Sequence, residues 1–189
     1  MALPTKSISL SEDLWYQCVH MTPGSSSKPY ILFLHGFPSS AYDWRHQISY
    51  FSQNGYGIIA PVCLGYGETS KPLDVEAYKG KKMASEIIAI LDRLNISKVM
   101  GVGHDWYIHP CWKRLFRCHR LTQVARGSSI LSRMANYYPE RFLKYAFVDI
   151  GYTPPGVSLT PDLLNHIDTL TKEHCGWECF GYEYLYQNE

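Results

Sequence analysis

Three short apolar runs, each followed by glycines and polar residues, most constrain what this chain can fold into. Residues 30–34, 56–61 and 98–103 have the length and composition of buried strands. Amphipathic helical segments separate them, one at about 75–94 and an earlier one with Trp44, Ile48 and Phe51 on one face. Strands that alternate with helices in this way predict a mainly parallel sheet with helices on both faces.

The rest of the chain extends this pattern. Residues 5–10 and 14–21 alternate like two strands of a hairpin at the edge of the sheet. After residue 126 a helical stripe runs to Pro139, and residues 145–150 predict a further strand. The fold class we expect is therefore α/β.

The 189 residues are enough for one globular domain with a substantial core. We expect residues 1–150 to form the N-terminal part of that core. From Gly151 the pattern changes, because Pro154 and Pro155 interrupt it and a new helix begins near Pro161. Residues 151–189 are therefore predicted to start a helical cap, and we expect both cap and core to be incomplete.

Chemically useful residues follow the predicted parallel strands where each strand ends. His35-Gly36-Phe37-Pro38 follows the first, a glycine-rich loop at residues 64–72 follows the second, and Gly103-His104-Asp105-Trp106 follows the third. Because the carboxyl ends of parallel strands meet at one edge of a sheet, these segments are expected to lie together. An aspartate in this position could be no more than a helix cap, but backbone N–H groups after His35-Gly36 could form an oxyanion hole beside it.

Asp105 is therefore the candidate nucleophile. A carboxylate is already ionised and can attack an sp3 carbon directly, forming an ester that water later cleaves. Suitable substrates carry a strained ring or a good leaving group on carbon.

Residues 107–126 interrupt the turn expected after Asp105, because small residues return only at Gly127-Ser128-Ser129. The segment has no acidic residue, and without its basic residues the net charge of +1 becomes −4. Those basic residues are Lys113, Arg114, Arg117, Arg120 and Arg126. One interpretation is a genuine insertion. The other is a translated intron, because the codons at both boundaries allow splice signals and excision restores the reading frame.

Composition excludes several other classes of function. No segment approaches the roughly 18 apolar residues of a membrane span, and the first residues do not resemble a secretion signal. Six irregularly spaced cysteines indicate free thiols in a reducing compartment, so we expect a cytoplasmic protein. The basic segment alone does not predict nucleic-acid binding. Cys175 and Cys179 beside His174 have no second ligand pair, so we expect neither a metal nor a cofactor.

Four motifs in this order resemble an α/β-hydrolase of the epoxide hydrolase type. They are HGFPSSAYDWR, LGYGETSKP, VGHDW and GSSILSRMANYYPERF. The resemblance covers about residues 10–187 outside 107–126. It implies a small apolar epoxide as substrate, opened to a vicinal diol through an alkyl ester.

The resemblance also implies roles for individual residues. Asp105 matches the nucleophile, and Phe37 and Trp106 match the residues whose backbone N–H groups stabilise the oxyanion. Tyr182 resembles the first lid tyrosine, which polarises the epoxide oxygen, although Tyr184 and Tyr186 lie close to it in sequence.

Two departures from the family bear on activity. Val62-Cys63 stands where relatives have an aspartate after proline, and this puts the hydrogen bonding of that loop in question. The family's water-activating histidine and its acid partner fall beyond Glu189, with Asp149 a poor substitute, so we expect this chain to be inactive in turnover. A haloalkane dehalogenase-like hydrolase and a non-catalytic fragment or binding module are the alternatives, and the oligomeric state stays open.

Overall fold

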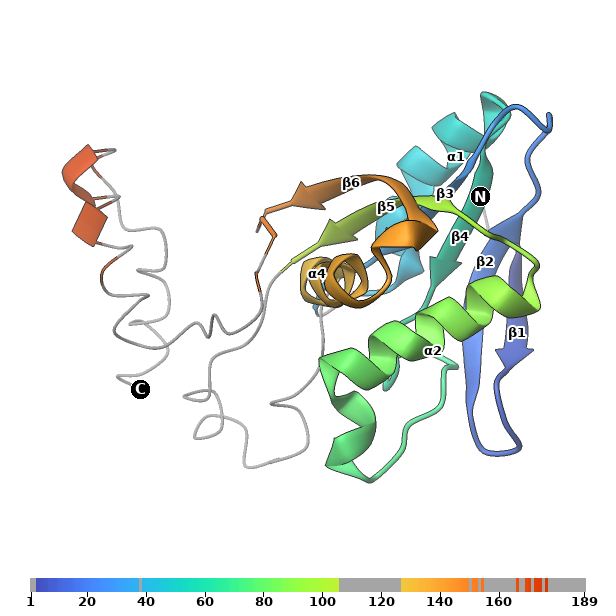
Figure 1. Cartoon of the computed structure of the whole chain (residues 1–189), viewed down its shortest axis with the longest axis horizontal. Helices are drawn as coiled ribbons and strands as arrows, with labels where there is room; N and C mark the ends of the chain where they lie inside the picture. Colours follow the sequence, from blue (N-terminus) through green and yellow to red (C-terminus); the bar gives the residue numbers. More distant parts are fainter. Residues whose placement is uncertain are drawn as a thin grey trace. The chain divides into compact units, whose positions relative to one another are not determined.

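A six-stranded mixed sheet is the main element of the described residues up to Asp149 (Figure 1). The computed structural model describes residues 3–37, 39–105, 127–149, 151–152, 154, 166, 169–170, 172–174 and 176. The strands are β1 (Thr5–Ser9), β2 (Trp15–Met21), β3 (Tyr30–Leu34), β4 (Gly57–Pro61), β5 (Val99–His104) and β6 (Phe142–Val148). Their order in the sheet is β1-β2-β4-β3-β5-β6. The pairs β1–β2 and β2–β4 are antiparallel, whereas β4, β3, β5 and β6 run parallel.

Helices cover both faces of this sheet, as the alternation of strands and helices predicts. Among the described residues they are η1 (Ala41–Trp44), α1 (Arg45–Gln53), η2 (Val75–Tyr78), α2 (Gly80–Arg93), α4 (Gly127–Tyr137) and η4 (Pro139–Arg141). Alternate residues of β3 point to opposite faces. Ile31 and Phe33 pack in one cluster with Ile48 of α1, while Leu32 and Leu34 pack in another with α2 and α4.

The structure corrects several predicted boundaries. The helix expected at about 75–94 is two helices, because Lys79 between them has an extended backbone with φ −63° and ψ 131°. The strand expected at 145–150 is β6, which begins three residues earlier at Phe142. Lys144 interrupts the apolar residues of β6, so a search for a continuous apolar run starts only after it.

The glycine-rich loop after β4 is fastened to the N-terminal hairpin. The hydroxyl of Thr69 accepts the N–H of Gln17 at 3.0 Å and donates to the carbonyl of Val62 at 2.8 Å. The backbone N–H of Trp15 donates to the hydroxyl of Ser70 at 2.9 Å, and the N–H of Ser70 donates back to the carbonyl of Trp15 at 3.1 Å. This loop therefore ties β2 to the segment that follows β4.

The chain divides into two compact units, Met1–Trp106 with Gln123–Pro155 and Tyr107–Thr122 with Gly156–Glu189. The division of the sequence into a core up to residue 150 and a cap from residue 151 stays a prediction. In the part of the chain that the structure describes, no helix is both long and apolar enough to cross a membrane. The expected cytoplasmic location likewise stays a prediction.

Candidate active site

Asp105 lies directly after β5, at the edge of the sheet where the parallel strands end. Its side chain is buried, with 6% of the residue exposed, and its backbone is left-handed with φ 77°. A non-glycine residue in this region is uncommon, and such strain concentrates at functional sites. The N–H of Asp105 donates to the carbonyl of Val148 at 3.3 Å, so the neighbouring strand β6 also holds the turn.

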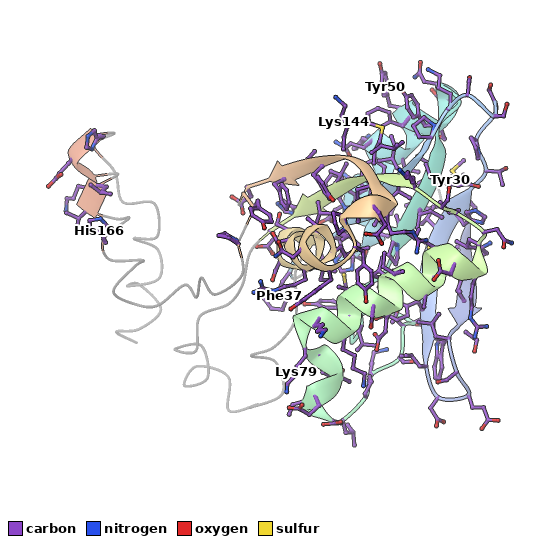
Figure 2. The ribbon with its side chains drawn as sticks, in the orientation of Figure 1. Tyr30, Phe37, Tyr50, Lys79, Lys144 and His166 are labelled. Atoms are coloured by element: carbon purple, nitrogen blue, oxygen red, sulfur yellow. The ribbon has the colours of Figure 1, made fainter. Side chains whose placement is uncertain are left out.

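Phe37 lies after β3 at the same edge, as predicted. Its backbone N–H donates to Oδ2 of Asp105 across 2.6 Å. Figure 2 shows Phe37 at the end of the sheet toward which the arrows of β5 and β6 point. A backbone N–H that meets a carboxylate oxygen at this distance is a charge-assisted hydrogen bond. The same N–H can stabilise negative charge on Oδ2 during a reaction.

Three glycines allow the chain to approach Asp105 this closely. A Cβ atom on Gly36 would lie 2.3 Å from Cβ of Asp105 and 2.6 Å from its Oδ2. A Cβ on Gly103 would lie 2.7 Å from the carbonyl oxygen of Gly127, and one on Gly127 would lie 2.0 Å from that of Leu34. All of these distances are shorter than van der Waals contact, so a larger residue would displace the backbone around the carboxylate.

His35 holds the loop that follows β3, because both of its ring nitrogens contact backbone groups. The N–H of Cys63 donates to Nε2 of His35 at 2.8 Å, and Nδ1 of His35 lies 2.8 Å from the carbonyl oxygen of Gly36. Nε2 is thus the acceptor and Nδ1 the donor, which defines a neutral ring. Burial lowers the pKa of His35, in agreement with this neutral form.

The bond between Cys63 and His35 shows how the loop at Val62-Cys63 is hydrogen-bonded. The loop keeps its contact with His35 without an aspartate, because the backbone N–H of Cys63 supplies the hydrogen bond. The N–H of Val62 is bound by the carbonyl of Gln17 at 2.8 Å. A backbone donor is independent of residue type, so sequence patterns do not reveal it.

Several predicted site residues lie outside the described residues. These are Trp106, Tyr182 and the segment 107–126. Their assigned roles stay predictions. Asp149, the poor candidate for a relay acid, follows β6 and also has φ 77°. It is exposed and stands at the strand end next to that of Asp105.

Two buried thiols lie in the described core. Burial raises the pKa of both Cys18 and Cys63 to about 12. The thiolate is the reactive form of cysteine, so these side chains are inert packing residues near neutral pH. Among the residues that the structure describes, no group of three or more His, Cys, Asp or Glu side chains could hold a metal ion.

Comparisons with known proteins agree with this fold. The family model for the alpha/beta hydrolase fold matches residues 29–106. Epoxide hydrolase A of Mycobacterium tuberculosis is 32% identical over 141 residues, which make up 71% of this chain and 44% of that protein. Epoxide hydrolase 2 of Siraitia grosvenorii is 42% identical over 103 residues, or 54% of this chain and 33% of that protein.

A solved structure gives the same result. Epoxide Hydrolase A from Mycobacterium thermoresistibile superposes with a TM-score of 0.62 at 27% identity, over 89% of this chain and 45% of that one. The chain spans less than half the length of these relatives. The fold, the family match and the relatives agree: the chain has the α/β-hydrolase fold and is similar to epoxide hydrolases over the part of them that it spans.

Proposed function

We propose that this chain carries the ester-forming half of an epoxide hydrolase reaction, with Asp105 as the nucleophile. The observation that carries the proposal is the 2.6 Å hydrogen bond from the N–H of Phe37 to Oδ2 of Asp105. This bond holds Oδ2 against the backbone of the loop that follows β3. Oδ1 is then the atom assigned to attack.

The chemistry follows from this assignment. Oδ1 forms a bond to a ring carbon of the epoxide while the ring C–O bond breaks, and the released oxygen takes a proton from an acid, the role we assign to Tyr182. Oδ2 becomes the carbonyl oxygen of the ester. When water attacks that ester, negative charge develops on Oδ2, where the N–H of Phe37 and, in this proposal, that of Trp106 stabilise it.

The names of the relatives support an epoxide as the substrate class, because all of those compared are called epoxide hydrolases. Hydrolysis of the ester needs a base that activates water. Residues 1–189 contain no histidine in the family's matching context, so in this proposal the chain is alkylated once and does not turn over.

Mass spectrometry after incubation with an aromatic epoxide tests the proposal. The expected result is one adduct, mapped to Asp105 and lost in Asp105→Ala, with no diol released. Asp13→Ala is a matched control, because it removes an exposed carboxylate that is far from Asp105 in sequence. The buried thiols should stay unmodified, since their pKa is about 12. Absence of both adduct and diol would contradict the proposal and favour a non-catalytic fragment or binding module.

A further inference from the structure

The two flanks of residues 107–126 meet in a turn. The N–H of Ser128 donates to the carbonyl oxygen of Asp105 across 3.2 Å, although 22 residues separate the two in sequence. If residues 107–126 were removed, Asp105, Trp106, Gly127 and Ser128 would be consecutive. The bond would then join the first and fourth residues, which is the hydrogen bond of a β-turn.

A second backbone bond fixes the same point. The N–H of Gly127 donates to the carbonyl oxygen of His35 at 3.0 Å. Gly127 also packs against β3 and β5 so closely that a Cβ atom on it would lie 2.0 Å from the carbonyl oxygen of Leu34 and 2.8 Å from the N of His104. The first residue of α4 therefore occupies a place beside the sheet that only glycine can fill.

The side chain of Ser128 anchors α4 independently. Its hydroxyl lies 2.9 Å from the carbonyl oxygen of Gly103 in β5 and 3.4 Å from that of Val148 in β6. Ser132, one helical turn later, donates its hydroxyl to the carbonyl of Ser128 at 2.8 Å. Both serines are buried. The start of α4 is thus held at Asp105 by contacts to the sheet.

We propose that residues 107–126 are dispensable for the fold and that Asp105, Trp106, Gly127 and Ser128 form a continuous nucleophile turn when they are removed. Gly127 and Ser128 are then the positioning residues for Asp105. The inference goes beyond the proposed function and does not rest on it, because its test measures folding.

The test compares the full chain with a chain from which residues 107–126 are deleted. Closing a loop with two intervening residues costs less entropy than closing one with 22, so the deletion should raise Tm by about 4–8 °C. Hydrogen exchange should show the N–H groups at the start of α4 equally protected in both proteins. A lower Tm, or rapid exchange at Ser128 in the deletion chain, would overturn the inference.

Three control variants keep the test specific. Deleting residues 106–126 leaves only Gly127 between Asp105 and Ser128, so the turn cannot close and Tm should fall below that of the full chain. In the chain lacking 107–126, Gly127→Ala should lower Tm, whereas Gly151→Ala should not, because no atom of the described residues lies within 4 Å of a Cβ on Gly151. Equal Tm values for these two alanine variants would refute the packing of α4 against β5.

Discussion

Replacing Gly36 with alanine should displace Asp105 and disable it while leaving the aspartate itself unsubstituted. The added Cβ would lie 2.3 Å from Cβ, 2.9 Å from Cγ and 2.6 Å from Oδ2 of Asp105. Carbon atoms in contact prefer separations of about 3.5–4.0 Å, so the overlap with Cβ exceeds about 1 Å. Either Asp105 or the turn at residues 35–37 must move, and the 2.6 Å hydrogen bond from Phe37 must lengthen.

The expected effects of Gly36→Ala can be estimated from these contacts. Overpacking of this kind costs about 1–3 kcal/mol, which lowers Tm by about 2–12 °C in a chain of this size. Attack on the epoxide depends on where the Asp105 carboxylate lies, and a misplacement of about 1 Å can cost about 100-fold in rate, so adduct formation should slow by about that factor.

Two measurements check this prediction. The first is thermal unfolding of Gly36→Ala beside the unaltered chain, and the second is the time course of the Asp105 adduct with an aromatic epoxide. Gly151→Ala is the matched control, since it adds the same methyl group in open space. If Gly36→Ala matched this control in both Tm and adduct formation, the close approach of Gly36 to Asp105 would be disproved.

Three further predictions concern the core and the transcript. Burial lowers the pKa of His35 in the folded chain below the ordinary value of 6.5, so protonation favours the unfolded chain as the pH falls below about 6.5. The Tm of the protein should therefore decrease with falling pH in this range, and the decrease should be less steep in His35→Gln. Tyr16 donates its hydroxyl to Oε2 of Glu86 at 2.6 Å inside the core. Tyr16→Phe leaves the Glu86 carboxyl without this partner and should lower the free energy of unfolding in urea by about 1–3 kcal/mol. The double variant Tyr16→Phe/Glu86→Leu also removes the carboxyl, so it should lose less stability than Tyr16→Phe alone. Sequencing the transcript should reveal messages without the 60 nucleotides that encode residues 107–126, and their retention in most reads would exclude the intron interpretation.

The sequence predicts the parts of the site that depend on strand ends. Asp105 and Phe37 follow β5 and β3, which are parallel neighbours, and the apolar runs before them are sufficient to bring both to one edge. Gly127 could also be predicted as the start of a helix, because small residues reappear there. At these three residues the element predicted from the local sequence is the one that brings the residue into its contact in the folded chain.

Other contacts could not be predicted because they depend on how separate loops meet. Nothing in the sequence around Cys63 indicates that its backbone N–H binds His35. The tautomer of His35 follows only from the positions of that N–H and of the carbonyl of Gly36. The division between η2 and α2 depends on the extended backbone of Lys79, a residue that fits well within a helix. Apolar periodicity does not contain that information.

Strand β6 has a consequence for how this polypeptide behaves at high concentration. Among the described residues, β6 pairs with β5 alone, and Leu143, Tyr145 and Val148 on it are 51%, 39% and 43% exposed. An unpaired, apolar edge is a template on which another chain can add a strand, and Lys144 is the one charged residue along it. For residues 1–189 taken alone, we expect a second copy to add along β6, because a strand added there would cover Leu143, Tyr145 and Val148.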